Sequence, residues 1–332
     1  MIYSKINDDD VQCTICATDL VFLVQRVDKY AYYSCPNCTL ITAVPKPTDL
    51  EIASFYNGFL YGMPKDEHFL GELEAKKKAV VRIDLDIKKY FNKTPLSLLD
   101  LGGGTGFYSE CFKNLGYKTT LIDIDQKACN YAASHFRDIK VVNVDPFNYS
   151  PEEKYDVVFA NQVIEHYRDI RAFMDSIKKF IKPNGLLIIA TPNQQCKEYF
   201  FRTSWWAFYL NKVSANKKIF SFQFLHTMFK FIKKPWICCD PPRHIFSFNK
   251  KSLSLLSYQT NWRVKNVFTE YSPSMYYSGK PGAVVFRRSH LLNPFVLARF
   301  LYVVIGIFIV RMIDFKNNYG ENLVIHLTPN EL

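Results

Sequence analysis

The chain has 332 residues, of which 48% are hydrophobic and 22% are charged. This composition excludes a largely disordered chain, and the length accommodates a full α/β domain with a smaller module beside it. The formal net charge of +11 is uneven, because residues 193–332 carry 19 Lys+Arg against 6 Asp+Glu (+13) and residues 1–192 carry 23 against 25 (−2). The basic half indicates an anionic partner, such as a membrane surface, a phosphate-bearing substrate or RNA, although a solvated basic face gives the same pattern.

The chain opens without the charged stretch and apolar run of a signal peptide, so we expect a cytoplasmic protein whose cysteines are thiols or metal ligands. Four of them follow the spacing C-x2-C-x18-C-x2-C: Cys13, Cys16, Cys35 and Cys38. Two such pairs supply the tetrahedral thiolate set of a structural Zn²⁺ site, with no position left open for catalysis. We predict a zinc ribbon over 1–48 with a β-hairpin over 20–34; four unligated cysteines are the alternative.

Residues 49–94 are predicted to be a linker followed by an amphipathic lead-in helix over 66–92. The main domain is expected over 95–332. Its strands are predicted at 96–101, 118–124, 139–144, 155–160 and 185–193. Its first helices are predicted at 108–115, 126–136 and 169–181. This alternation predicts a Rossmann-like, parallel, doubly wound α/β sheet, in which ligands bind at the carboxyl ends of the strands.

Polar and glycine residues stand at those strand ends. They are Asp100, Gly102, Gly104 and Gly106 after the first strand, Asp123 after the second, Asp145 after the third, and Asn161 and Gln162 after the fourth. The loop "LGGGTGF" is not a dinucleotide fingerprint, because Phe107 takes the place of the third glycine, and it lacks the lysine of a P-loop. A ribose diol on Asp123, an exocyclic amine on Asp145 and a glycine-lined tail without phosphates together describe S-adenosylmethionine.

The chain resembles the class I S-adenosylmethionine-dependent methyltransferases. The resemblance is carried by "LLDLGGGTGF", "LIDID", "NVDPF", "YDVVFANQVIEHYRD" and "IKPNGLLIIATPN", in order over 70–195, and it resumes over 241–270. It implies that Gly102, Gly104 and Gly106 line the methionine moiety, with Asp100 at the start of the same motif. It also implies that Asp123 takes the ribose hydroxyls, that Asp145 lies beside the adenine, and that Asn161 and Gln162 lie beside the methyl donor.

"NQVIEH" also resembles the E-x-x-E-H motif of ubiquinone-biosynthesis O-methyltransferases, in which the acids and the histidine are associated with a divalent metal. Gln162 replaces the first acid here, whereas Glu165 and His166 remain. The replacement disfavours a metal and favours a pair that shapes the loop. His166 is kept as a candidate catalytic residue.

"PPRHIFSFNKKSLSLLSYQTNW" and "YYSCPNCTLITAVPKP" resemble segments of bacterial methyltransferases linked to the synthesis of surface polysaccharides or lipid-linked glycans. His244 is the candidate general base, because imidazole accepts a hydroxyl proton near neutral pH. The alternative is that His244 holds the substrate loop by hydrogen bonds.

Two further segments bear on the acceptor. The stretch 194–240 is rich in aromatic and basic residues, which is typical of a lid over a hydrophobic acceptor, a membrane-surface helix or an RNA-stacking surface; a buried helix pair is the alternative. The stretch 291–312 is hydrophobic but its uncharged run is too short to span a bilayer. It is predicted to be a half-inserted helix at the inner membrane face, or else a buried helix before the final strand "NLVIHL".

The sequence thus predicts a methyltransferase that uses S-adenosylmethionine and a structural Zn²⁺ and acts on a hydroxyl of a sugar or lipid-linked acceptor. The alternatives are an RNA methyltransferase, a sugar C-methyltransferase and a non-catalytic S-adenosylmethionine-binding scaffold. An anionic membrane surface is a possible partner, RNA is not excluded, and no obligate protein partner is evident from the sequence.

Overall fold

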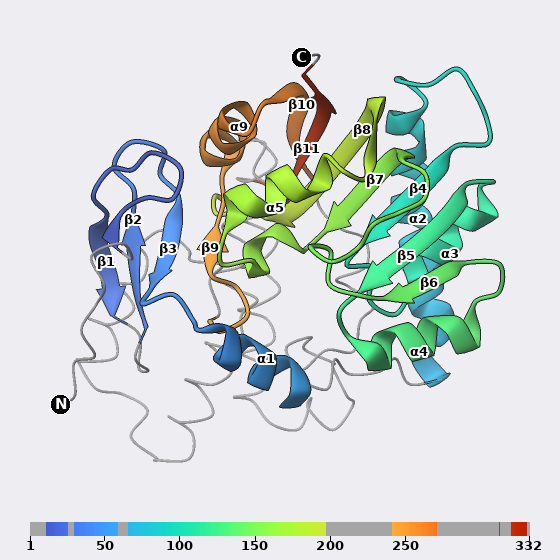
Figure 1. The fold of residues 1–332 in the computed structure, drawn as a ribbon, viewed down its shortest axis with the longest axis horizontal. Coiled ribbons are helices and arrows are strands. Elements are labelled where there is room, and N and C mark those ends of the chain that lie inside the picture. The colour runs from blue at the N-terminus through green and yellow to red at the C-terminus, as the bar shows by residue number, and fades with distance from the viewer. Residues whose placement is uncertain are drawn as a thin grey trace.

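The structure is a computed structural model that describes residues 11–25, 30–58, 66–196, 241–270, 312 and 320–330. These residues form a four-stranded sheet and a seven-stranded sheet with helices on both faces of the larger one (Figure 1). The predicted segments 194–240 and 291–312 lie outside the described residues, apart from 194–196 and Met312. In the part of the chain that is described, no helix has the length and apolar character needed to cross a membrane.

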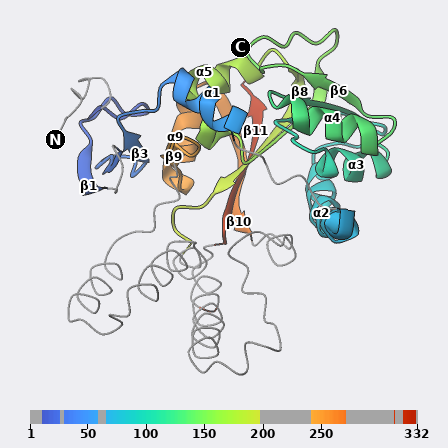
Figure 2. The ribbon, with the colours of Figure 1, turned by 90° about the horizontal axis from the view of Figure 1, so that it is seen from below.

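The smaller sheet contains the hairpin that the sequence predicts. Strands β1 (Val21–Gln25), β2 (Ala31–Ser34) and β3 (Ile41–Val44) pair antiparallel in that order. A fourth strand, β9 (Phe246–Ser247), joins the free edge of β3 from a part of the chain far away in sequence. Figure 2 shows β9 and α9 (Lys250–Gln259) between this small sheet and the strands of the larger one.

The larger sheet has the order β10-β11-β8-β7-β4-β5-β6. Its strands are β4 (Ser97–Leu101), β5 (Lys118–Asp123), β6 (Lys140–Asn143), β7 (Tyr155–Asn161), β8 (Ile181–Pro192), β10 (Trp262–Glu270) and β11 (Asn322–Pro329). The doubly wound prediction is confirmed for β4 to β8, which pair parallel. The sheet is mixed rather than all parallel, because β11 lies antiparallel between β8 and β10, a pairing that needs no crossover helix.

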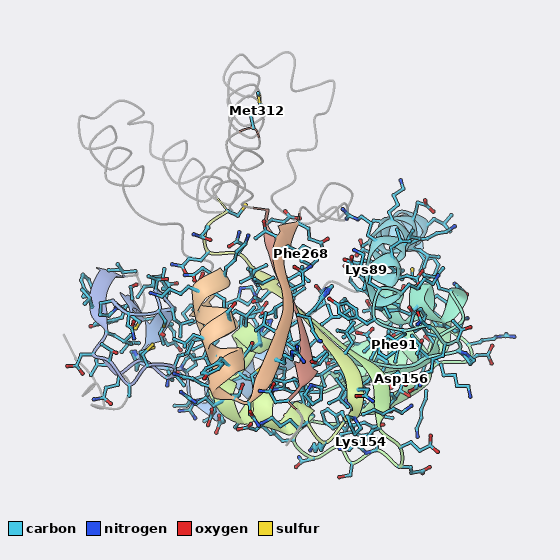
Figure 3. The ribbon with its side chains drawn as sticks, turned by 90° about the horizontal axis from the view of Figure 1, so that it is seen from above. Lys89, Phe91, Lys154, Asp156, Phe268 and Met312 are labelled. Carbon is cyan, nitrogen blue, oxygen red and sulfur yellow. The ribbon has the colours of Figure 1, made fainter. Side chains whose placement is uncertain are left out.

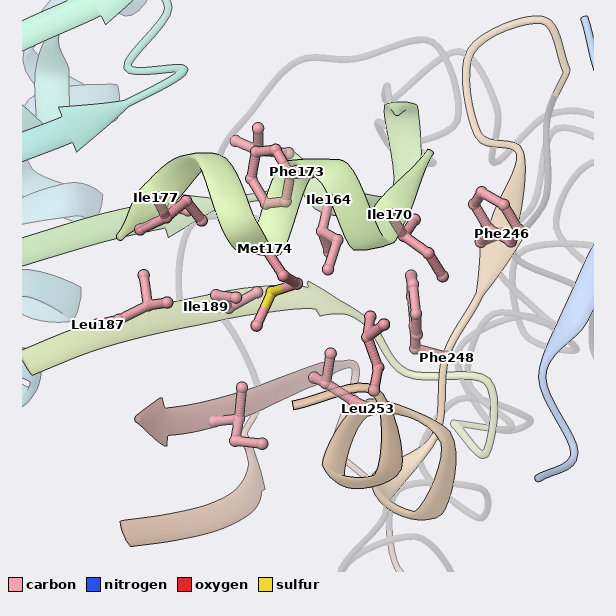
Figure 4. Close-up of a cluster of buried hydrophobic side chains, with 14 of the residues drawn as sticks. Ile164, Ile170, Phe173, Met174, Ile177, Leu187, Ile189, Phe246, Phe248 and Leu253 are labelled. Atoms are coloured by element: carbon pink, nitrogen blue, oxygen red, sulfur yellow. The ribbon is translucent and has the colours of Figure 1, made fainter. Parts of the chain in front are cut away.

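Helices cover both faces of this sheet. On one face lie α2 (Asp66–Ile87), α3 (Phe107–Asn114) and α4 (Gln126–His135), and on the other lie α5 (Ile170–Ile177) and α9; α1 (Asp49–Gly58) precedes α2. Strand β8 serves both cores, because Leu186 and Ile188 pack with α2 and α3 whereas Leu187 and Ile189 pack with α5 (Figure 4). This alternation is the period of two that a strand buried on both faces requires.

The region after α5 differs from the sequence prediction. The helix predicted over 169–181 ends at Ile177, and β8 begins at Ile181, before the "KPNG" that was expected to separate helix from strand. The pairing of β7 with β8 explains the difference. Tyr155 pairs with Ile181, but Val157, only two residues further along β7, pairs with Leu186. The turn residues are therefore extra residues within one extended strand, as in a β-bulge.

Asp156 ties the starts of three neighbouring strands together. Its carboxylate is 2.7 Å from Nζ of Lys93 and 3.0 Å from Nζ of Lys182, and it accepts hydrogen bonds from the backbone N–H and the hydroxyl of Ser97. Burial alone would raise the pKa of Asp156, but the two lysines and Ser97 lower it below its ordinary value. Figure 3 labels Asp156 among the side chains of the larger sheet.

We predict that Asp156→Asn lowers the free energy of unfolding by about 1–3 kcal/mol at neutral pH, because charge-assisted hydrogen bonds to a buried carboxylate are lost. The lowered pKa means that this contribution is present above about pH 4 and is lost as the pH falls through the folded-state pKa. Urea denaturation of both proteins at several pH values measures it. A difference that stays constant down to acid pH would contradict the assignment.

Candidate active site

The carboxyl ends of the parallel strands bring the first group of predicted residues together. After β4, the loop turns back onto β5, where the backbone N–H of Gly102 donates to the carbonyl of Ile122 at 2.8 Å and that of Gly104 donates to Oδ2 of Asp123, also at 2.8 Å. Gly102, Gly104 and Gly106 all have positive φ angles, 70°, 54° and 83°. The loop therefore takes a course that other residues rarely adopt.

The three glycines of this loop differ in how much room a side chain would have. A Cβ on Gly102 would lie 2.7 Å from Cγ2 of Val163, and one on Gly106 would lie 2.9 Å from Cβ of Ala132 in α4, whereas one on Gly104 would have no neighbour within 4 Å among the described residues. The first and last glycines are thus required by packing. The space at Gly104 is open at the edge where such sheets bind ligands.

Asp100 and Asp123 lie on either side of this loop. Asp100 is only 2% exposed and accepts a 2.6 Å hydrogen bond from Oγ of Ser109 in α3, so it fixes the helix to the strand end. Burial, and then the neighbouring Asp123, raise the pKa of Asp100 to about 7. Asp123 accepts backbone hydrogen bonds from Gly104 and Asp125, and burial raises its pKa. Each carboxylate oxygen of Asp123 keeps acceptor capacity for a further donor.

Asp145, Asn161 and Gln162 stand at the ends of the next strands. Oδ1 of Asp145 accepts a 2.7 Å hydrogen bond from the backbone N–H of Phe147, which shapes the loop after β6. Gln162 has a φ of 59°, and its side chain donates to Oδ1 of Asn322 at 3.2 Å. A non-glycine residue with positive φ at a strand end is a strained conformation that the surrounding structure must hold.

The second group is built around two histidines that the sequence predicted separately. His166 ends a short 3-10 helix, η2 (Ile164–His166), and His244 precedes β9. Their rings meet edge to face with centroids 4.7 Å apart, and one donor atom from each of Glu165, His166 and His244 lies within 4.8 Å of the others. The sequence singled out all three residues but gave no sign that they form one cluster.

Burial favours the neutral forms of His166 and Glu165 in this cluster. Burial, and then His244 and Arg243, lower the pKa of His166 well below its ordinary value. Burial also raises the pKa of Glu165 to about 7. Its Oε2 accepts a 2.9 Å hydrogen bond from Thr191, whereas Oε1 lies 4.0 Å from Nε2 of His166 and has no hydrogen-bond partner among the described residues. A neutral imidazole can accept a proton, so the cluster can act as a general base.

Sequence reasoning missed several residues around the site. Thr191 orients Glu165, and Arg243 bears electrostatically on both Glu165 and His166. Arg243 stands beside His244 in the motif "PPRH" and could have been found there, whereas Thr191 carries no signal in the sequence. A small pocket lined by Tyr108, Asn161 and Glu270 among others was also not predicted.

The four cysteines form the cluster that their spacing predicts. Their sulfur atoms all lie within 4.8 Å of one another, and Sγ of Cys13 is 3.6 Å from Sγ of Cys38. Four ligands at a Zn–S distance of about 2.3 Å would have sulfurs about 3.8 Å apart. In each pair the backbone N–H of the second cysteine points at the sulfur of the first, at 3.4 Å for Cys16 and 3.3 Å for Cys38. The donor set fits a tetrahedral thiophilic metal.

Comparison with known proteins bears on the whole of this region. A family model described as a methyltransferase domain matches residues 75–267. The ubiquinone biosynthesis O-methyltransferase of Rhodopseudomonas palustris (strain TIE-1) is 36% identical over 115 residues, which cover 31% of this chain and 43% of that protein. The enzyme of the same name from Pelagibacter ubique (strain HTCC1062) is 35% identical over 111 residues, covering 32% and 46%. The chain thus spans less than half the length of these curated relatives.

Solved structures are similar at lower identity. The 1,6-didemethyltoxoflavin-N1-methyltransferase of Burkholderia thailandensis, solved with bound 1,6-didemethyltoxoflavin and S-adenosylhomocysteine, is 12% identical with a TM-score of 0.48, over 92% of this chain and 99% of that one. An S-adenosylmethionine-dependent methyltransferase from Archaeoglobus fulgidus is 18% identical with a TM-score of 0.44, over 79% and 99%.

The glycine loop gives a test by stability. We predict that Gly106→Ala lowers the melting temperature clearly more than Gly104→Ala does. Both changes place a side chain at positive φ, at a cost of about 1–2 kcal/mol, but only Gly106→Ala also meets Ala132. Thermal denaturation of the two variants decides this. Equal losses would contradict the packing assigned to the loop.

Proposed function

The chain belongs to the methyltransferase domain family, and from this premise we propose that it transfers a methyl group from S-adenosylmethionine to a hydroxyl of a sugar or lipid-linked acceptor. The observation that carries the proposal is the contact between the rings of His166 and His244 at the edge where β7 ends. A hydroxyl must give up its proton to become a good methyl acceptor, and such a pair can take it. The relatives named O-methyltransferases support a hydroxyl acceptor.

The glycine loop fits the cofactor. The open space at Gly104 and the remaining acceptor capacity of Asp123 suit a tail without phosphates and a ribose diol. When bound, S-adenosylmethionine supplies an electrophilic methyl group on a sulfonium. Asp123 would bind the ribose hydroxyls, the loop from Gly102 to Gly106 would hold the methionine end, and Asp145 would face the adenine.

The histidine cluster would handle the proton. His244 would accept the hydroxyl proton of the acceptor, and His166, edge to face against it, would add no positive charge of its own because its pKa is lowered. Glu165 would be a further proton acceptor, because burial raises its pKa to about 7 and its Oε1 lies 4.0 Å from Nε2 of His166. The rest of the rate would come from holding the hydroxyl in line with the methyl group.

We also propose that Cys13, Cys16, Cys35 and Cys38 hold a structural Zn²⁺, as the sulfur distances and the two backbone N–H groups support. Elemental analysis of the purified protein should find about one zinc per chain. Cys35→Ser should lose it, whereas Cys111→Ser, at a buried thiol outside the cluster, should keep it. Equal zinc content in the two variants would contradict the site.

Asp123 allows a test of cofactor binding. We predict that Asp123→Asn weakens binding of S-adenosylhomocysteine at least about tenfold, because a charged acceptor for two hydroxyls is lost. Asp125→Asn is the matched control, because Asp125 caps the N-terminus of α4, a role that asparagine fills equally well. The affinity of this variant for S-adenosylhomocysteine should stay within about twofold of the wild-type affinity. Calorimetric titration measures both. Equal losses would contradict the role of Asp123.

The two histidines allow a test of chemistry. We predict that His244→Ala and His166→Ala each lower kcat by about 10²–10⁴ while the affinity for S-adenosylhomocysteine stays unchanged. In the wild type, protonation of His166 should lower kcat/KM only at acid pH, well below the ordinary histidine pKa of about 6.5, because the neutral ring of His166 is the active form. Full activity in His244→Ala would contradict the base and leave this residue a role in holding the loop.

The acceptor class is tested with S-adenosylmethionine labelled in its methyl group. The protein is incubated with RNA, soluble and membrane-lipid fractions of the source cell, and His244→Ala serves as the control. Alkali-stable methyl ether label in the lipid or soluble glycan fraction would support the proposal, and in the lipid fraction also an action at the membrane face. Label in RNA or on carbon would contradict it. Binding of S-adenosylhomocysteine with no label in any fraction would indicate a scaffold.

A further inference from the structure

The cysteine module, defined here as residues 11–48, shares a strand with the active site. Strand β9 completes its sheet, with Thr42 opposite Phe246 and Ile41 opposite Ser247. The pairing extends one step toward His244, because the backbone N–H of Ala43 donates to the carbonyl of Ile245 at 2.9 Å. The segment that carries His244 is thus held by the module on one side.

The other side of the same residue is bonded to the histidine cluster. The backbone N–H of Ile245 donates to the carbonyl of Glu165 at 2.9 Å, and Ile245 is fully buried. Ile245 follows His244, and Glu165 precedes His166. One residue therefore connects the cysteine module to both histidines through its backbone, and the 4.7 Å separation of their rings depends on where β9 lies.

Each pair of cysteines is also pinned to the larger domain. Arg171 of α5 donates from Nε to the carbonyl of Thr14 and from Nη2 to that of Ile15, both at 2.7 Å, inside the first pair. Behind the second pair, Nδ2 of Asn249, the residue that caps α9, donates to Oγ1 of Thr39 at 2.7 Å. The larger domain therefore binds both cysteine loops, and a bound metal would fix the shape of these same loops.

We propose that the cysteine module is a positioning element for catalysis: with its metal bound, it holds β9 so that His244 stays against His166. The proposal rests on the proposed function for what His244 does, whereas the coupling between the metal and the position of β9 does not. A module this small depends on its metal for folding, so metal loss removes the sheet partner of β9. The glycine loop from Gly102 to Gly106, which follows β4 and is hydrogen-bonded to β5, should keep its shape.

The test measures hydrogen exchange of the Ile245 amide with S-adenosylhomocysteine present, before and after a chelator removes the metal. We expect exchange to become at least about tenfold faster without metal and to return when Zn²⁺ alone is added back. After metal removal, the affinity for S-adenosylhomocysteine should change less than about twofold, whereas kcat should fall as the Ile245 amide loses its protection from exchange. Unchanged exchange at Ile245 after metal removal would overturn the proposal.

A second variant tests the coupling with the metal in place, in case the stripped protein unfolds. Arg171→Ala removes both hydrogen bonds to the first cysteine pair, and we expect faster exchange at Ile245 with zinc content preserved. Arg168→Ala is the matched control, since Arg168 pairs with the exposed Asp49 at 3.1 Å and touches neither cysteine pair in the contacts described. Wild-type exchange in Arg171→Ala would overturn the proposal. Because exchange needs no acceptor, failure to find methyl transfer would contradict the proposed function alone.

Discussion

Parallel strands end at a common edge of their sheet, and this constraint assembles the candidate site. Strands β4, β5 and β7 each contribute one end, and the 2.8 Å hydrogen bond from Gly104 to Asp123 joins the first two directly. This arrangement strains the backbone at Gln162, which has a positive φ. Hydrogen bonds from its backbone N–H to Ala190 and from its side chain to Asn322 hold this conformation. The strain lies where the chain must turn between β7 and the histidine cluster.

Burial is the second organising factor, because it disfavours charge on both sides of the glycine loop. It raises the pKa of Asp100 and of Glu165 to about 7, and it lowers the pKa of His166. A site with these properties suits a neutral acceptor, whose proton is removed during the reaction, better than an anionic one. The same burial disfavours protonation of His166 near neutral pH, so this ring adds no positive charge beside the proposed base His244.

The sequence predicted what depends on local pattern. The alternation of strands and helices, the glycine loop after Asp100 and the cysteine pairs each follow from short sequence patterns, and the structure contains all three. Contacts between distant segments were not predictable in this way. Nothing in "HIFSF" indicates that β9 pairs with β3, and nothing around "NLVIHL" indicates that β11 runs antiparallel, because a strand has the same period in either direction. The meeting of His166 with His244 follows from those long-range pairings.

The central claim is that His166 stays neutral against His244 so that the two rings together can accept a proton, and the most direct measurement is a pH titration of their ring nitrogens by nitrogen-15 NMR with S-adenosylhomocysteine present. The account predicts that the ring of His166 stays neutral well below the ordinary histidine pKa of about 6.5, and that replacing His244 shifts that titration. Two rings that titrate independently near 6.5 would contradict it.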